Sequence, residues 1–330
     1  MTLSSTTAPL ASAHDAVLLD LDGVVYRGDV AVPHAVDALA SVTGRLAFLT
    51  NNANRPPEVV AAHLTDLGLA ADVDDVVTSA QAIASVMSRD LPPGAAVLTV
   101  GGEGLRQAVA ARGLEPVEDH HDARLAAVVQ GYSPDVGWRH LAAAAYAVGR
   151  GLPWYVSNTD LTIPTAEGIA PGNGALVQAV RFATGVEPVV AGKPFAPLFE
   201  ETLARLAPTR PIMVGDRLDT DIRGARGAGI PSLFVLTGVN DLTDVIATPP
   251  SDRPDYVGAD LRALHDVHPA VDLESGRAVC GRAEAAIRDG RLRLTRAGSS
   301  TESVRALVAL GWAHRDESNE SLQVDATIEP

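Results

Sequence analysis

The chain has 330 residues, 46% of them hydrophobic and 20% charged, which is enough for about two globular domains and excludes a disordered or fibrous chain. Acidic residues outnumber basic ones by 41 − 26 = 15, so nucleic acid is not expected as a partner. A single cysteine excludes an internal disulfide, and no apolar stretch reaches the ~18 residues of a membrane span. We therefore expect a cytoplasmic protein with no membrane span.

The first 261 residues alternate between two kinds of segment. Residues 1–13, rich in Ser, Thr and Ala, predict a disordered start. Short apolar runs that end in small or polar residues predict buried parallel strands at 16–20, 46–50, 212–215 and 232–236. Helical spacing, often with Pro near the first turn, predicts helices at 33–42, 56–67, 197–206 and 220–228. The alternation predicts an α/β fold with a doubly wound, Rossmann-like parallel-sheet core, whose ligands bind at the carboxyl ends of the strands.

A second α/β series interrupts this core, which takes residues 14–80 and 190–261. Within residues 81–189, strands are predicted at 95–100, 126–129 and 154–157, and helices at 104–112, 140–149 and 173–184. This stretch is long enough to be an inserted domain.

The tail, residues 262–330, predicts a small α+β C-terminal extension. It has a first helix, strands at 278–287 and 291–295, and a helix at 301–310. Such a piece buries little core alone, so we expect it to dock on the main body or on a second copy of the chain, as in a homodimer.

Two carboxylates follow the first predicted strand. Asp20 and Asp22 are expected on the same side because side chains alternate along a strand, and Gly23 permits a sharp turn. Crowded carboxylates favour a hard cation such as Mg²⁺, which binds one or two carboxylates together with phosphate oxygens. This motif alone has two alternative interpretations. One is an acidic turn with no catalytic role, and the other is the pair of aspartates that binds the metal of a glycosyltransferase.

Three further segments offer groups for the same chemistry. Asp216 follows another predicted strand and could complete a metal site, with Asp221 bracing it from the next helix. Thr50 and Asn51 close a strand with donors suited to a phosphoryl group. Lys193 is the one lysine among 26 basic residues, and its compact ammonium suits a single phosphoryl oxygen in a tight pocket. Together with the first motif, these groups predict phosphoryl transfer.

The four segments, in this order and with the insertion between the second and third, resemble the haloacid dehalogenase superfamily of phosphatases. The chain is similar to the branch with a large α/β cap that contains glycerol-3-phosphate, phosphoglycolate, pyridoxal and p-nitrophenyl phosphatases. Within that branch it most resembles the actinobacterial glycerol-3-phosphate phosphatases. The resemblance covers residues 13–261 and implies that residues 81–189 are the cap.

The resemblance implies two catalytic roles. Asp20 would be the nucleophile that becomes an aspartyl phosphate. Asp22 would be the general acid that protonates the leaving alkoxide, and then the base that activates water. A carboxylate at position 22 disfavours dehalogenation, and the lack of a membrane span excludes the related transport ATPases.

The resemblance also implies ligands for the metal and the substrate. Mg²⁺ would be held by Asp20, the backbone carbonyl of Asp22 and Asp216, with Asp221 in support, and the phosphoryl group would be bound by Thr50, Asn51 and Lys193. The expected activity is hydrolysis of a small phosphorylated metabolite, and glycerol 3-phosphate is the first candidate substrate. Phosphoglycolate and a range of sugar phosphates are alternative substrates. The alternative from another class of protein is a sensor that binds a phosphorylated ligand without hydrolysing it.

The loop at residues 158–164, followed by Gly168 and residues 171–174, resembles the cap loop that lies over the phosphoryl site in this branch. Ile163 falls where a relative acting on pyridoxal phosphate would place a histidine, so an aliphatic residue there favours a small substrate. Asn158 and Asp160 are expected to hold the loop through Asx turns rather than to contact the ligand.

Two other patterns are given structural interpretations. Gly101-Gly102-Glu103-Gly104 resembles the start of a dinucleotide fingerprint, but its third glycine is replaced by Gln107, so a tight strand-to-helix turn is expected. His120-His121-Asp122 is expected in a loop, and His265 and His268 on a solvated helix face.

Overall fold

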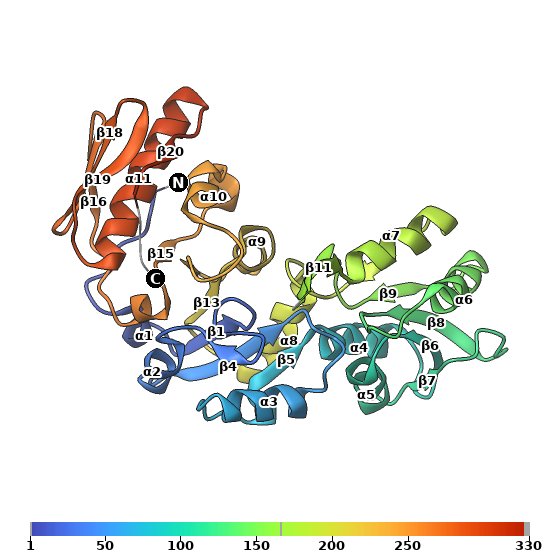
Figure 1. Cartoon of the computed structure of the whole chain (residues 1–330). Helices are drawn as coiled ribbons and strands as arrows, with labels where there is room; N and C mark the ends of the chain where they lie inside the picture. Colours follow the sequence, from blue (N-terminus) through green and yellow to red (C-terminus); the bar gives the residue numbers. More distant parts are fainter. Residues whose placement is uncertain (1, 166, 327–330) are drawn as a thin grey trace. The chain divides into compact units, whose positions relative to one another are not determined.

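The computed structural model describes residues 2–165 and 167–326 (Figure 1). The chain divides into two compact units. Unit 1 comprises the described parts of Met1–Phe48, Thr65–Ala70 and Ala207–Pro330, and unit 2 comprises those of Leu49–Leu64 and Ala71–Leu206. The predicted domain borders at 80, 189 and 261 stay predictions. No helix among the described residues is long and apolar enough to cross a membrane.

A six-stranded sheet has the strand order β15-β14-β13-β1-β4-β5. Its strands are β1 (Ala16–Asp20), β4 (Arg45–Thr50), β5 (Val76–Thr78), β13 (Pro211–Gly215), β14 (Ser232–Val235) and β15 (Tyr256–Gly258). Strand β13 pairs in parallel with both β1 and β14, and β14 pairs in parallel with β15. The apolar runs of β1 and β13 are almost entirely buried, as strands covered on both faces require. The predicted α/β core with a parallel sheet is confirmed.

Short elements surround the strands of unit 1. They are α1 (Leu10–Ala13), β2 (Tyr26–Arg27), β3 (Val30–Ala31), α2 (Ala35–Ala40), the π-helical turn η2 (Leu218–Ile222), α9 (Arg223–Gly227), α10 (Leu242–Ala247), and the 3₁₀ turns η3 (Pro250–Asp252) and η4 (Leu261–Leu264). Helix α3 (Pro57–Asp66) follows β4. The helix predicted at 220–228 therefore begins as a π-helical turn and continues as α9.

The start of the chain differs from the disordered segment that its composition predicted. The Ser4 N–H donates to the Asp255 carbonyl at 2.9 Å, and the Thr6 N–H donates to the His268 carbonyl at 2.8 Å. Leu10 is fully buried. Backbone hydrogen bonds and one apolar anchor order this segment, which composition alone does not reveal.

The tail forms a five-stranded sheet in the order β16-β17-β18-β19-β20. Its elements are β16 (Val271–Glu274), β17 (Arg277–Cys280), β18 (Ala283–Arg288), β19 (Arg291–Arg296), α11 (Ser300–Ser318) and β20 (Gln323–Val324). The single strand predicted at 278–287 was wrong: Gly281, with φ +55°, turns the chain between β17 and β18.

Helix α11 attaches the tail to the rest of unit 1, as Figure 1 shows. Val304, Val308 and Trp312 share a hydrophobic cluster with Phe234 of β14 and Val257 of β15. The expectation that the tail docks on the main body is confirmed.

The prediction that His265 and His268 lie on a solvated helix face was wrong. The His268 ring is fully buried beyond η4, where its Nε2 lies 2.9 Å from the Ala263 carbonyl. His265 contacts the Ala38 carbonyl at 2.7 Å. Neither residue belongs to a solvated helix face.

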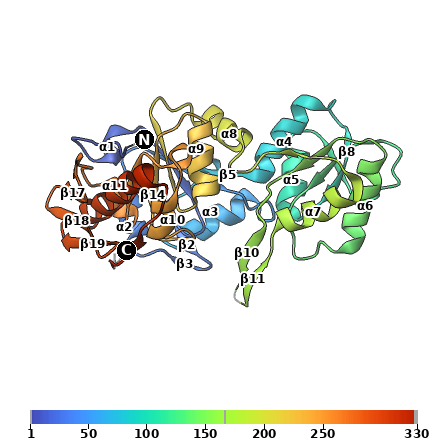
Figure 2. The ribbon, with the colours of Figure 1, turned by 90° about the horizontal axis from the view of Figure 1, so that it is seen from above.

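Unit 2 contains a parallel sheet in the order β12-β9-β8-β6-β7. Its strands are β6 (Ala96–Val100), β7 (Glu115–Val117), β8 (Leu125–Gln130), β9 (Trp154–Val156) and β12 (Val189–Val190). Its helices are α4 (Ser79–Asp90), α5 (Glu103–Ala111), α6 (Trp138–Gly149), α7 (Asn173–Thr184) and α8 (Ala196–Leu206). A hairpin of β10 (Thr162–Thr165) and β11 (Gly168–Pro171) projects from this unit (Figure 2). The predicted second α/β series is confirmed.

The glycine pattern before α5 is a packing feature. A Cβ on Gly102 would lie 1.8 Å from Asn54 Oδ1, and the Gly104 N–H donates to the Asn54 carbonyl at 2.9 Å. The loop that carries Asn54 thus fills the place beside the helix N-terminus where a dinucleotide phosphate would bind. The predicted tight turn is confirmed.

Candidate active site

Three aspartates gather in unit 1. Asp20 ends β1, Asp216 follows the neighbouring strand β13, and Asp221 lies in η2. One carboxylate oxygen from each lies within 4.8 Å of the other two. Asp216 and Asp221 are 0% and 1% exposed, respectively. Negative charges held this closely with little water repel one another, so the arrangement favours a bound cation.

Backbone groups hold two of these carboxylates in place. The Val239 N–H donates to Asp216 Oδ2 at 2.6 Å, and the Arg217 N–H donates to Asp221 Oδ2 at 3.1 Å. Asp221 lies in the π-helical turn, where the N–H groups of Asp221 and Ile222 both donate to the Arg217 carbonyl, at 3.0 and 3.2 Å. Single π-helical turns are frequent at functional sites.

Asp22 lies in the tight turn after β1 and is exposed. Gly23 adopts φ +92°, and its N–H donates to the Tyr26 carbonyl at 2.8 Å. The turn therefore needs a residue that tolerates the left-handed region. Among the described residues, the close carboxylate cluster does not include Asp22. An exposed carboxyl in a fixed turn can exchange protons with a substrate or with water.

The predicted phosphate-binding residues lie in unit 2. Thr50 ends β4 and is 3% exposed, and its Oγ1 accepts from the Asn52 N–H at 3.0 Å. Lys193, between β12 and α8, is 2% exposed. Its Nζ donates to the Leu49 carbonyl at 3.4 Å, and its N–H donates to Asn51 Oδ1 at 2.8 Å. A buried ammonium, held through its backbone, is suited to binding an anionic group.

Asn158 and Asp160 contact Asn51, in the loop that follows β4. Asn158 Nδ2 donates to the Asn51 carbonyl at 2.6 Å, and the Asp160 carboxylate accepts from Asn51 Nδ2 at 3.0 and 3.2 Å. The Asp160 N–H donates to Asn158 Oδ1 at 3.2 Å, which is the expected Asx-type contact. Ile163 lies half-buried in strand β10 rather than in a loop, and its predicted role in substrate choice stays a prediction.

Two further buried residues, for which no role was predicted, belong to this network. The Ser79 Oγ donates to the Asn51 carbonyl at 2.6 Å, and Asn173 Nδ2 donates to the Asn158 carbonyl at 2.7 Å. Ser79 follows the short strand β5, so a hydroxyl after an apolar run was the available signal. Asn173, flanked by Gly172 and Gly174 at the start of α7, lies in residues 171–174, which the resemblance to the cap loop includes.

The chain was compared with known families and proteins. Residues 17–115 match the model described as haloacid dehalogenase-like hydrolase, and residues 190–264 match a second model described as HAD-hydrolase-like. The D-glycerol 3-phosphate phosphatase of Mycobacterium tuberculosis is 51% identical over 256 residues, which cover 78% of this chain and 72% of that protein. The chain belongs to the haloacid dehalogenase-like hydrolases.

Two further similarities place this haloacid dehalogenase-like hydrolase among phosphatases. The acid sugar phosphatase of Staphylococcus saprophyticus is 35% identical over 76% of this chain and 96% of its own length. The crystal structure of the M. tuberculosis glycerol phosphate phosphatase in complex with magnesium has a TM-score of 0.85 and 44% identity, and the match covers 98% of this chain and 96% of that one. The protein is a phosphatase.

Proposed function

We propose that this phosphatase hydrolyses glycerol 3-phosphate to glycerol and phosphate, with Mg²⁺ and an aspartyl phosphate at Asp20. The observation that carries the proposal is the cluster of three aspartates, two of which lie at the ends of adjacent parallel strands. The choice of substrate is supported by the 51% identical relative, which is named as a D-glycerol 3-phosphate phosphatase.

The donor set of the cluster fits Mg²⁺. Three carboxylates within 4.8 Å, two of them nearly inaccessible to water, offer the hard oxygen ligands that this ion prefers. Asp20, Asp216 and the backbone carbonyl of Asp22 would hold the metal, with Asp221 in support. When bound, Mg²⁺ would neutralise charge on the transferring phosphoryl group.

The first half-reaction transfers the phosphoryl group to the protein. A carboxylate oxygen of Asp20 forms a bond to phosphorus while the bond from phosphorus to the glycerol oxygen breaks. An alkoxide is a poor leaving group, so protonated Asp22 donates its proton to that oxygen as glycerol leaves.

The second half-reaction restores the enzyme. Asp22, now ionised, takes a proton from a water molecule whose oxygen attacks phosphorus. The bond between phosphorus and Asp20 breaks, which releases inorganic phosphate and leaves Asp22 protonated for the next cycle. Exposure of Asp22 is compatible with both proton transfers.

Thr50, Asn51 and Lys193 have supporting roles in this proposal. The ammonium of Lys193 and the hydroxyl of Thr50 bind phosphoryl oxygens, and Asn51 fixes the backbone of Lys193 through its amide. A positive charge and a hydroxyl favour the transition state, in which negative charge spreads over the phosphoryl oxygens.

A substrate panel tests this function. Phosphate release is measured for glycerol 3-phosphate, phosphoglycolate and several sugar phosphates, with Mg²⁺ and with a chelator. Glycerol 3-phosphate is expected to have the highest kcat/KM, and the chelator is expected to abolish its hydrolysis. Higher kcat/KM for phosphoglycolate or a sugar phosphate would reject the proposed substrate, and release of no phosphate from any ester would favour a sensor.

Two variants control for the catalytic assignment. Asp20→Asn should abolish turnover because an amide cannot form the phosphoryl intermediate. Asp219→Asn is the matched control: this exposed aspartate pairs with Arg217 and lies outside the cluster, so it should keep activity.

A further inference from the structure

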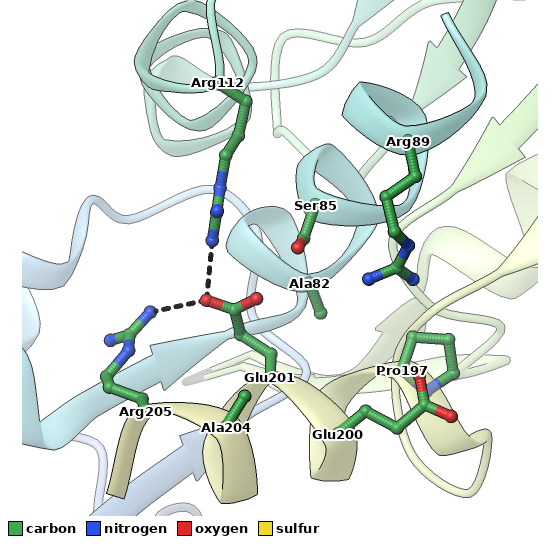
Figure 3. Close-up of a pocket in the computed structure, with 9 residues that line it drawn as sticks. All are labelled: Ala82, Ser85, Arg89, Arg112, Pro197, Glu200, Glu201, Ala204 and Arg205. Atoms are coloured by element: carbon green, nitrogen blue, oxygen red, sulfur yellow. Dashed lines mark hydrogen bonds and ion pairs between the residues drawn. The ribbon is translucent and has the colours of Figure 1, made fainter.

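A cavity of about 480 Å³ lies within unit 2, between helices α4, α5 and α8 (Figure 3). It is lined by Ala82, Ser85, Arg89, Arg112, Pro197, Glu200, Glu201, Ala204 and Arg205. None of these residues takes part in the chemistry proposed above. Its volume lies within the range of small-molecule sites, roughly 300 to 1,000 Å³.

The charge of the lining is opposite to that of the protein. Three arginines and two glutamates give the cavity a formal charge of 3 − 2 = +1, whereas the whole chain has −15. Negative groups elsewhere repel anions, so a locally positive cavity is a specific feature rather than a consequence of composition.

Two of the arginines are held in place. Glu201 Oε1 accepts from Arg112 at 2.6 Å and from Arg205 at 3.1 Å, and Arg205 also donates to the Val76 carbonyl at 2.9 Å. One carboxylate thus fixes two guanidinium groups, and this trio keeps a net positive charge. Each guanidinium has five N–H donors, so both retain donors for a further acceptor.

Arg89 adds a third guanidinium from α4. Among the described residues, no carboxylate lies within salt-bridge distance of it, although Glu200 also lines the cavity. In Figure 3, Arg112 and Arg89 lie on either side of the nearly buried Ser85: Arg112 reaches Glu201, and the guanidinium of Arg89 lies on the side of Pro197 and Glu200. The two guanidinium groups and the hydroxyl all line the same cavity.

We propose that this cavity binds a small phosphorylated metabolite at a site separate from the phosphoryl-transfer residues. Planar guanidinium groups match the oxygens of a phosphate in paired hydrogen bonds, which makes arginine better suited to this task than lysine. Arg89, Arg112 and the Ser85 hydroxyl contact the phosphate, while Glu201 orients Arg112 and Arg205. The proposal does not depend on which ester the enzyme hydrolyses.

The cavity lies between two helices whose first residues are close to the predicted phosphate-binding residues. Helix α4 begins at Ser79, whose hydroxyl bonds the Asn51 carbonyl, and α8 begins three residues after Lys193. A phosphate that bonds Arg89 of α4 and Arg112, which Glu201 of α8 holds, would link these helices.

Calorimetric titration with sulfate, a tetrahedral dianion that is not hydrolysed, tests the proposal in the full-length protein. Arg89→Gln should weaken binding to the cavity about tenfold because one charge-assisted contact is lost. Glu200→Gln should strengthen it about threefold, because it removes a negative charge from the rim. Arg139→Gln, which changes an exposed arginine on α6, is the matched control and should change nothing.

Sulfate binding at the phosphoryl site must be distinguished from binding in the cavity. The wild type should show two binding events. Lys193→Met should lose binding at the phosphoryl site and keep binding in the cavity. The double variant with Arg89→Gln and Arg112→Gln should lose binding in the cavity and keep binding at the phosphoryl site. Unchanged binding in the double arginine variant, or complete loss in Lys193→Met alone, would overturn the proposal. Thermal unfolding of each variant shows whether its fold is retained.

Discussion

The side chain of Asn51 forms two hydrogen bonds with the backbone of Lys193, which lies 142 residues further along the chain. Its Oδ1 accepts from the Lys193 N–H at 2.8 Å, and its Nδ2 donates to the Lys193 carbonyl at 3.1 Å. The amide therefore fixes the only lysine of the protein through groups that any residue at position 193 would have.

Asn51→Ala is predicted to lower kcat/KM for phosphate esters by about 10- to 100-fold, because Lys193 loses its positioning contacts. The melting temperature should fall as well, since the hydrogen bonds from the Asn51 amide to the Asp160 carboxylate are lost. Steady-state kinetics and thermal unfolding measure the two effects. A stable variant with wild-type kcat/KM would show that Asn51 does not position Lys193 for the reaction.

Asp216→Asn should weaken metal binding without destabilising the fold. Removing one of three crowded carboxylates relieves repulsion, so the metal-free variant is expected to unfold at a higher temperature than the metal-free wild type. Added Mg²⁺ should raise the melting temperature of the wild type, through binding to the native state, and should hardly change that of the variant. An equal rise in both proteins would exclude Asp216 as a ligand.

Burial lowers the pKa of His268 to about 4 from an ordinary value of 6.5. The Arg305 guanidinium, 3.4 Å from Nδ1, adds to this effect. The native state therefore resists protonation that the unfolded chain accepts, so stability should fall as the pH decreases from about 6.5 to 4.

Urea unfolding at pH 7 and pH 5 measures this dependence. His268→Gln should flatten the change in unfolding free energy between the two pH values, because the variant has no imidazole to protonate. His140→Gln, at an exposed position, is the control and should keep the wild-type slope. A wild-type slope in His268→Gln would place the pH dependence elsewhere.

The sequence predicted the strands that carry the chemistry because they are continuous apolar runs with polar residues at their carboxyl ends. Residues 16–20 and 46–50 agree with β1 and β4 to within one residue. Helix α10 was missed, although Asp241 and Asp244 form a capping box at its start. That helix has six residues, too few for a clear periodic pattern.

Spatial proximity within the site was harder to predict than the residue types. Asp20, Asp216 and Asp221 could be grouped because the carboxyl ends of parallel strands lie at one edge of a sheet. The hydrogen bonds of Asn51 to Asp160 and Lys193 connect residues that are 109 and 142 positions apart, respectively, and no local pattern encodes them. In the tail, the burial of His268 depends on packing from several segments and was predicted wrongly.

Trp312 is predicted to be the main anchor of the C-terminal extension. Its ring is 2% exposed, its Nε1–H donates to the Val245 carbonyl at 2.7 Å, and the Arg253 guanidinium lies 4.7 Å from the ring centroid. Trp312→Ala should cost about 3–5 kcal/mol of unfolding free energy.

Trp138→Ala is the comparison for this variant, because Trp138 is 75% exposed and its removal should change the unfolding free energy by less than about 0.5 kcal/mol. Chemical denaturation measures both. Similar small losses in the two variants would mean that Trp312 does not anchor the extension.

The central claim is that Asp20 is the nucleophile and Asp22 the general acid and base. Pre-steady-state kinetics of Asp22→Asn with p-nitrophenyl phosphate tests it most directly. The p-nitrophenolate group leaves without a proton, so Asp20 can still be phosphorylated, whereas water lacks its base. We predict a burst of one p-nitrophenolate per active site followed by slow turnover, and no burst with Asp20→Asn. A burst in Asp20→Asn, or full steady-state turnover in Asp22→Asn, would contradict the account.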